Sequence, residues 1–488
     1  MPESPQPITV ILQENQLNII KIGLGLFLAR ICQPLFSVLL FTAAARLLSL
    51  EVFGLYALLM GMLFIFQLCS VLGLGPVLTR EISTNLEATG KWIGSALFIL
   101  LPASLLVAAI FVSLLSFMSS SAQAFSGALT IAIAMPCLAF LQIAEAAFIA
   151  HGRSSSVIVL NFSENLFRIV LSLVLLFLDQ GLPGLLAAYV ISKLVGSLLA
   201  YYLLRRLPGN KKLNVDAEAV SFLIKNTAIY GSMLLLATLY FRIDIITLSI
   251  FQGDIAVGIY SAAYRVITLA FIIGDSLVSA FFPAISQALI KNRETARELT
   301  ASMINFLLLL KLPMVLGLVF IAPFLLPLLF GTEFQPSATI LVILAFLLPF
   351  NGINGILGFL LNAAKLEKMA LKINIVMVFF HATLTSMLSA KYGIKGAAWG
   401  LLCSTLTASL VFGWVVSKKL FSLNSFKLFI RITIVLGGIA AFLLIPEPLF
   451  AWRLAALPTL VFALWACQFI QVSEIKRNWR LLRGQASA

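Results

Sequence analysis

The sequence is mostly a succession of apolar stretches, each long enough to cross a lipid bilayer, separated by short charged or turn-forming segments. A transmembrane helix needs about 20 predominantly apolar residues, and cutting the chain at these segments predicts about fourteen such helices. They are expected near 22–47, 53–77, 92–117, 124–149, 156–178, 183–204, 226–250, 258–289, 303–330, 336–362, 370–390, 395–417, 427–445 and 449–471. The predicted fold class is therefore an all-α integral membrane protein.

The composition agrees with this fold class. Hydrophobic residues make up 61% of the 488 residues and charged residues only 11%. An average soluble domain is about half apolar and a quarter charged, so the composition argues against a water-soluble enzyme.

The excess of basic residues follows the expected topology. If both termini are cytoplasmic, most of the 33 lysines and arginines fall in the inward connections or the C-terminal tail. The outward connections hold only Arg46, Lys391, Lys395 and Arg453. Lys and Arg are retained on the cytoplasmic side during insertion, so both termini are predicted to be cytoplasmic, in a bacterial inner membrane. The basic charge therefore needs no nucleic-acid partner.

The two halves of the chain resemble each other. Gly181 aligns with Gly393, and Gly184 with Gly396, at an offset of 212 residues (393 − 181). This displacement spans six predicted helices, an even number, so both copies would have the same orientation in the bilayer. The repeat predicts two six-helix lobes that flank a central cavity. The expected division is an N-terminal lobe 1–206, a cytoplasmic linker 207–225, a C-terminal lobe 226–419, and an extra helix pair with a basic tail 420–488.

Ionisable residues within the predicted spans are candidates for function. Such a group at the bilayer centre costs about 2.5–3.5 kcal/mol on insertion scales and usually faces the bundle interior or a wet cavity. The cations are Arg30, Arg168, Lys193, Arg242, Arg265 and Lys311, and the anions are Glu145, Glu164, Asp244 and Asp275. Because cations outnumber anions, the cavity is expected to carry surplus positive charge.

The spacing of these charges suggests different roles. Glu164 and Arg168 are four residues apart, in the order that favours an ion pair on one helix, so they are predicted to form a structural pair. Arg242 and Asp244 are two apart and point to different faces, so each is expected to find its partner elsewhere. Asp244 could hold a coupling ion, or it could pair with Arg30 or Arg265. The candidates for ion coupling are Asp244, Asp275 and Glu145.

Soluble-type enzymatic motifs are missing from the sequence. It has no GxxxxGK[ST] loop for ATP and no HExxH motif, and its two histidines do not suggest a catalytic triad. We therefore expect no cofactor, metal site or catalytic residue, and His381 is interpreted as a polar packing residue.

Three segments resemble the polysaccharide transporter family of the MOP exporter superfamily, which includes the O-antigen flippases. They are EVFGLYALLM from residue 51, RIDIITLSIFQGDIAVGIYSAAYRV from residue 242, and LLPLLFGTEFQPSATILVIL from residue 325. The resemblance implies a flippase that moves an undecaprenyl-diphosphate-linked oligosaccharide, such as an O-antigen unit of lipopolysaccharide, between leaflets by alternating access. It also implies membrane lipids as surroundings and polysaccharide polymerase or chain-length proteins as partners.

This cargo fits the cations in the spans. A diphosphate needs counter-charges in a low-dielectric region, and arginine binds phosphate oxygens bidentately. We therefore predict that Arg30, Arg242 and Arg265, with Lys311, bind the diphosphate. Two other functions stay open. A MATE-like drug or cation antiporter would want a net acidic cavity, and a membrane polymerase or glycosyltransferase would normally have a large extramembrane loop.

Overall fold

The computed structural model describes residues 36–71, 73–118, 121–207, 213–422 and 425–443. These ranges contain helices and connecting turns but no strand. Nine helices among the described residues are long and apolar enough to cross a membrane, which confirms the all-α membrane fold. Most of the first predicted span, all of the last and Arg30 lie outside the described residues, so the total of about fourteen helices stays a prediction.

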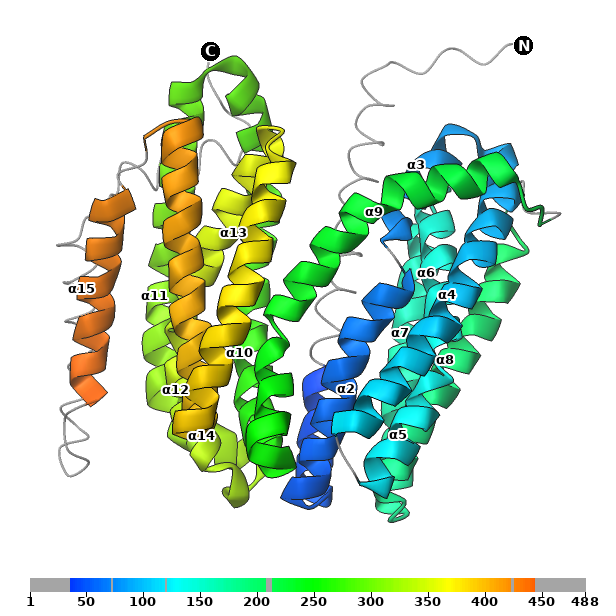
Figure 1. Ribbon diagram of the computed structural model, residues 1–488, viewed down its shortest axis with the longest axis horizontal. Helices are drawn as coiled ribbons and strands as arrows, with labels where there is room; N and C mark the ends of the chain where they lie inside the picture. The colour runs from blue at the N-terminus through cyan, green and yellow to red at the C-terminus, as the bar shows by residue number, and fades with distance from the viewer. Residues whose placement is uncertain (1–35, 72, 119–120, 208–212, 423–424, 444–488) are drawn as a thin grey trace, which may run out of the picture. The chain divides into compact units, whose positions relative to one another are not determined.

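The chain divides into two compact units between Arg242 and Ile243. The helices of the first unit are α2 (Leu50–Val71), α3 (Leu74–Thr84), α4 (Thr89–Met118), α5 (Ala122–Ala132), α6 (Met135–Ala150), α7 (Ser154–Phe177), α8 (Gly181–Leu204) and α9 (Ala217–Tyr240). Helix α8 packs against both α6 and α7, and these three lie side by side in Figure 1. This group carries most of the charged residues described below.

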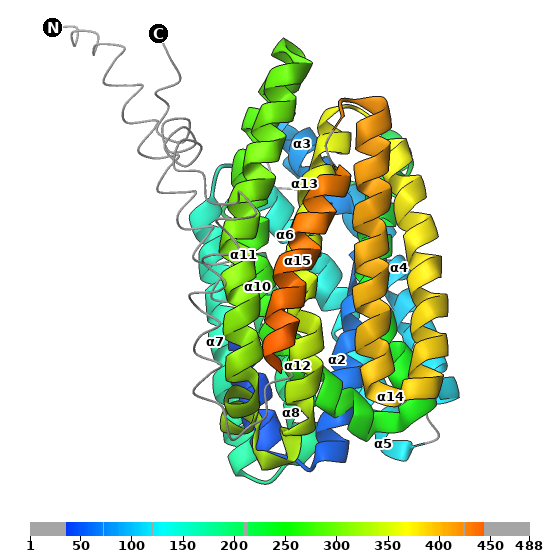
Figure 2. The ribbon, with the colours of Figure 1, turned by 90° about the vertical axis from the view of Figure 1, so that its left-hand side faces the viewer.

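The second unit begins with α10 (Ile243–Lys291), which bends at Gly253, where the backbone adopts φ 76°. The further helices are α11 (Arg293–Phe330), α12 (Pro336–Ala345), α13 (Leu347–Ala363), α14 (Glu367–Lys419) and α15 (Ser425–Leu443). Helix α14 turns back at Gly393, where φ is 62°, so it consists of two arms. Figure 2 shows these arms side by side.

One predicted span in each half is broken at the corresponding place. The fourth predicted span is interrupted at residues 133–134, between α5 and α6, and the tenth at Phe346, between α12 and α13. The breaks lie about 212 residues apart, like the aligned glycines. The repeat is therefore present in the backbone as well as in the sequence.

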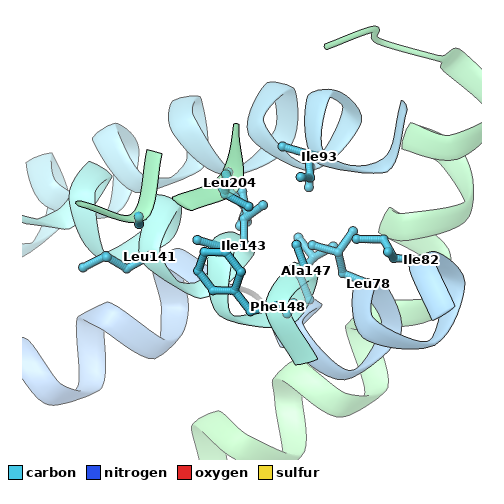
Figure 3. Packing of buried hydrophobic residues seen from close by; sticks show 14 of the residues in the cluster. Leu78, Ile82, Ile93, Leu141, Ile143, Ala147, Phe148 and Leu204 are labelled. Atoms are coloured by element: carbon cyan, nitrogen blue, oxygen red, sulfur yellow. The ribbon is translucent and has the colours of Figure 1, made fainter. Parts of the chain in front are cut away.

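A hydrophobic cluster joins one end of α3, α4, α6, α8 and α9 (Figure 3). Ile93 of α4, Phe148 of α6 and Leu223 of α9 are each at most 1% exposed in it. Trp92 adds an edge-to-face contact with Phe222, with ring centroids 5.8 Å apart. This packing places α9 in the first unit. The observed boundary therefore lies after α9, whereas the sequence analysis expected the division at 207–225.

The end of the expected linker is fixed to the start of α4. The Asn214 N–H donates to the Gly90 carbonyl at 3.4 Å, and the Asp216 N–H donates to Ser95 Oγ at 3.1 Å. A Cβ on Gly94 would lie 2.4 Å from the Asn214 carbonyl oxygen. Only glycine therefore allows this close approach between the linker and the helix.

Asp216 also caps helix α9 electrostatically and by hydrogen bonding. Its Oδ1 accepts from the Ala219 N–H at 2.8 Å, and its Oδ2 lies 3.1 Å from the Lys91 ammonium. The hydrogen bond from the Ala219 N–H, followed by the interaction with Lys91, holds the pKa of the Asp216 carboxyl below its usual value. The ionised carboxylate is thus the form that anchors the linker.

Candidate functional site

A group of polar and charged side chains lies between α6, α7 and α8 within the first unit. At its centre, Glu164 of α7 forms a hydrogen-bonded ion pair with Lys193 of α8. The Glu164 side chain is 4% exposed and that of Lys193 is 14% exposed. A Cβ on Gly196 would lie only 3.1 Å from Glu164 Oε2, so the glycine leaves the room that the carboxylate occupies. The partner of Glu164 is therefore Lys193, whereas the sequence analysis expected Arg168.

Arg168, without Glu164 as partner, makes two contacts with neutral groups. Its Nη2 donates to Asn165 Oδ1 at 3.0 Å, and its guanidinium carbon lies 5.9 Å from the centre of the Tyr189 ring. Its Nε–H is buried and has no acceptor within the described part of the chain. Leaving such a donor unsatisfied costs about 1–3 kcal/mol. The half-buried Arg168 is thus a cation without a carboxylate partner among the described residues.

Glu145 of α6 lies in the same group and was predicted as a candidate for ion coupling. Its Oε1 accepts from Asn161 Nδ2 at 2.9 Å. The carbonyl of Asn161 in turn accepts from Asn165 Nδ2 at 2.7 Å. Because Asn165 also binds Arg168, a line of hydrogen bonds runs from Glu145 to Arg168 through two carboxamide residues.

Asp244, another predicted candidate for ion coupling, is fully buried in the second unit. Its Oδ2 accepts a hydrogen bond from the Tyr260 hydroxyl, and its Oδ1 accepts from the Ile245 N–H at 2.9 Å. Tyr260 stacks on Tyr264 with ring centroids 5.9 Å apart. The carboxylate therefore lies inside the unit, held by a phenol and a backbone donor.

Lys311 is also fully buried in the second unit. Its ammonium lies 3.5 Å from Asn351 Oδ1 of α13 and 5.9 Å from the centre of the Phe271 ring of α10. A Cβ on Gly274 would lie 2.4 Å from Lys311 Nζ, so the lysine passes over a position that has no side chain. Lys311 thus points into the packing of α10, α11 and α13.

The remaining predicted residues lie in different places. Arg242 is half-buried between α9 and α10, and its guanidinium carbon lies 5.0 Å from the centre of the Phe64 ring. Arg265 is half-buried on α10. Asp275 is on the same helix, but its side chain is outside the described residues, as is all of Arg30. Their roles stay predictions.

The two arms of α14 enclose a neutral polar group. His381 is fully buried, and its Nδ1 is hydrogen-bonded to Ser404 Oγ at 2.8 Å and to Thr385 Oγ1 at 3.0 Å. Among the described residues, no group of three His, Cys, Asp or Glu side chains could hold a metal ion. His381 contributes to packing between the arms in this arrangement.

Two sequence families match the chain. The model of the family described as polysaccharide biosynthesis protein matches residues 20–289, and the model of the MatE family matches residues 231–387. The chain is 24% identical over 389 residues to the probable low-salt glycan biosynthesis flippase Agl15 of Haloferax volcanii, covering 78% of this chain and 80% of that protein. It is also 24% identical to the capsular polysaccharide biosynthesis protein CapF of Staphylococcus aureus, covering 58% of this chain and 72% of CapF.

Solved structures share the fold. The lipid II flippase MurJ in an inward closed conformation matches with a TM-score of 0.71 at 15% identity, covering 92% of this chain and 98% of MurJ. An inward-facing multidrug resistance MATE family transporter of the MOP superfamily matches with a TM-score of 0.66 at 16% identity, covering 78% of this chain and 93% of that chain. At these identities the likeness concerns the fold alone.

Proposed function

The chain belongs to the polysaccharide biosynthesis protein family, and from this premise we propose that it is a flippase, a transporter rather than an enzyme, for a lipid-linked oligosaccharide. The observation that carries the proposal is the family match over residues 20–289 of a chain built from membrane-spanning helices. The similarity to a protein named as a glycan biosynthesis flippase supports it. The cargo would pass from the cytoplasmic to the outer leaflet.

The proposed substrate carries its oligosaccharide on undecaprenyl diphosphate, and the sugar is an O-antigen or another surface polysaccharide unit. A diphosphate in a low-dielectric region requires cations, and arginine provides paired N–H donors for phosphate oxygens. We propose that Arg30, Arg242 and Arg265 contact the diphosphate. Lys311 is fully buried within the second unit, so it would contribute through its charge rather than by direct contact.

The proposed mechanism is alternating access. Parallel repeats of this kind move largely as rigid bodies around a site near the middle of the bilayer. Each of the two units is compact by itself, which suits movement as a rigid body.

Ion coupling would require a carboxylate that changes its occupancy during the cycle. Asp244, Asp275 and Glu145 are the proposed candidates. Replacing Asp244 with Asn removes the charge but keeps the side-chain shape next to Tyr260. If Asp244 couples transport, D244N should transport glycolipid at a rate that no longer responds to an imposed proton or sodium gradient. A gradient response equal to that of the wild type would reject this role.

The proposed setting is a bacterial inner membrane, with both termini in the cytoplasm and polysaccharide polymerase or chain-length proteins as partners. These proteins would consume the product on the outer side. A tag on either terminus should be accessible to protease only from the cytoplasmic side, whereas accessibility from the outer side would contradict this orientation.

The substrate proposal is tested by removing the three arginines together. The variant R30Q/R242Q/R265Q should lose translocation of lipid-diphosphate oligosaccharide in reconstituted vesicles. The matched control R80Q/R153Q/R293Q changes three arginines outside the predicted spans and should transport like the wild type. Equal transport by the two triple variants would reject the assignment of these arginines, and no transport by the wild-type chain would reject the flippase function.

A cation antiporter is the second candidate, because the MatE family model matches residues 231–387. The greater number of cations than anions in the predicted spans favours the flippase. Vesicles containing the wild-type chain distinguish the two functions: the antiporter would move a cationic dye under an ion gradient and leave lipid-linked oligosaccharide in its original leaflet.

A further inference from the structure

We propose that Arg168 forms an anion-binding site in the first unit and binds the diphosphate of the lipid-linked substrate as the substrate crosses the membrane. This inference rests on the flippase function proposed above and adds a residue that the sequence had assigned to a structural ion pair. It follows from the partners, depth and repeat position of Arg168.

The first argument is that the nearby carboxylates have other partners. Glu164 is bound to Lys193, and Glu145 accepts from the Asn161 carboxamide. Arg168 contacts only the Asn165 carboxamide and the Tyr189 ring within the described residues. Its positive charge therefore has no ion-pair partner in this part of the chain.

The second argument is the way in which the guanidinium is held. Asn165 binds Nη2 at 3.0 Å, and the Tyr189 ring lies 5.9 Å from the guanidinium carbon. These two contacts use one of the five N–H donors of the arginine. The side chain is only half-buried, so further donors can meet a ligand. A guanidinium with free neighbouring N–H groups matches two phosphate oxygens.

The third argument is depth. Helix α7 contains 24 residues from Ser154 to Phe177, and Arg168 comes 14 residues (168 − 154) after its first residue. At about 1.5 Å per residue, Arg168 lies about 21 Å along a helix of about 36 Å. A phosphate group that crosses the membrane passes this level, where water is least available and a fixed cation is most useful.

The fourth argument comes from the second repeat. The offset of 212 residues that relates Gly181 to Gly393 relates Arg168 to Phe380. Phe380 is 39% exposed. The positions equivalent to Glu164, Asn165, Tyr189 and Lys193 are Val376, Met377, Leu401 and Thr405. The same pair of helices thus packs in the second repeat without these charges, so packing alone does not require Arg168.

The test measures lipid binding to the full-length chain in nanodiscs of phosphatidylcholine. The probes are undecaprenyl diphosphate, undecaprenyl monophosphate and phosphatidylglycerol, and the variants are R168Q, R168K and R80Q. The wild type should prefer the diphosphate. R168Q should weaken diphosphate binding at least about tenfold, because a charge-assisted hydrogen-bond pair is lost. R168K should retain an intermediate affinity, and the exposed control R80Q should bind like the wild type.

Several results would overturn the inference. Unchanged diphosphate affinity of R168Q, in a variant that unfolds at the wild-type temperature, removes Arg168 from the site. If R168Q does not fold, R168K gives the answer, and an affinity equal to that of the wild type overturns the proposal. An equal loss of phosphatidylglycerol binding would identify a general lipid headgroup site instead of a substrate site.

The flippase function is read out separately, by translocation of a fluorescent lipid-diphosphate oligosaccharide in vesicles. Wild-type translocation with unchanged R168Q binding means that the site assignment fails and the flippase function stands. Diphosphate binding that depends on Arg168, together with no wild-type translocation, means that the flippase function fails and the anion site stands.

Discussion

The helix pair α7–α8 and the two arms of α14 are the same structural unit at two places in the chain. Each is a pair of neighbouring helices joined at a glycine with positive φ, which is 52° at Gly181 and 62° at Gly393. In both, a glycine three residues later allows the helices to approach closely. A Cβ on Gly184 would lie 3.1 Å from Leu175 Cβ, and a Cβ on Gly396 would lie 1.9 Å from the Leu388 carbonyl oxygen.

The interiors of the two pairs differ in charge. Between α7 and α8, the polar contacts are the Glu164–Lys193 ion pair and the stacking of Arg168 on Tyr189. Between the arms of α14, His381 is hydrogen-bonded to hydroxyl groups. The comparison teaches that the backbone constraints of the repeat reside in its glycines, whereas the polar residues between the helices can diverge. The difference in charge is therefore a guide to function.

The largest expected effect comes from removing one partner of the charged interior. E164Q leaves the Lys193 ammonium without its counter-ion, and breaking a buried pair in this way costs about 3–5 kcal/mol. Unfolding of the purified protein in detergent, monitored by circular dichroism, should show this loss. The double variant E164M/K193M removes both charges and should recover most of the stability. Similar losses in the single and double variants would mean that the ion pair does not determine the effect.

The next effect separates the close approaches in the two pairs. G396A brings a methyl group against a backbone carbonyl, so the arms of α14 must move apart, at a cost of about 3 kcal/mol. G184A meets side-chain atoms of Leu175 and Gln180, which can adjust more easily, so its cost should be about 1 kcal/mol. Thermal unfolding of both variants tests this order. A reversed order would contradict the interpretation that the arms of α14 approach more closely.

A smaller effect is expected for the neutral polar group. H381F keeps a ring between the arms but removes the hydrogen bonds to Ser404 and Thr385, at a cost of about 1–2 kcal/mol. Ser404 still donates to the Leu401 carbonyl at 3.0 Å, which limits the loss. The same unfolding measurement should place H381F well below E164Q in effect. A loss as large as that of E164Q would show that the neutral group stabilises its helix pair as strongly as the ion pair does.

The smallest effect concerns Asp216, which lies outside the membrane-spanning helices and contrasts with Glu164 inside them. Its pKa is lower in the folded chain, chiefly because the Ala219 N–H binds the carboxylate. A lowered folded-state pKa gives stability that is complete above the unfolded value of about 3.9 and is lost as pH falls through the folded value. Hydrogen exchange at the start of α9 should therefore accelerate under acidic conditions.

The variant D216N is the control for this pH effect. It has no carboxyl group at position 216 to titrate, so the exchange of α9 should change less between neutral and acidic pH than in the wild type. The same acceleration in D216N would assign the pH effect to another group.

Much of the fold could be predicted from the sequence, because long apolar stretches and turn glycines are local signals. The predicted spans 156–178 and 183–204 agree within two residues with α7 and α8. The boundary between the two units was placed too early, since charged linker residues suggested a division that the contacts of α9 override. A linker that packs against α4 has the same composition as one that does not.

The candidate site was less predictable. Spacing of four residues favours Glu164 and Arg168 on one helix, but Lys193 on the neighbouring helix reaches the carboxylate instead. One signal was available: Glu164 and Lys193 lie at nearly equal distances from the turn at Gly181, so an antiparallel helix pair places them at the same level. The burial of Lys311 depends on contacts among three helices, which spacing along one chain does not encode.

The Glu164–Lys193 pair also has a consequence for biogenesis. An isolated charge makes a nascent helix less willing to leave the insertion channel for lipid. Because the two charges belong to consecutive helices, α7 gains its counter-ion once α8 has been synthesised, and the two segments enter the bilayer most favourably together. The arms of α14, which have no such pair at the equivalent positions, can partition one after the other. Ribosome-bound intermediates that end between α7 and α8 should therefore stay longer beside the translocation machinery than those that end at Gly393.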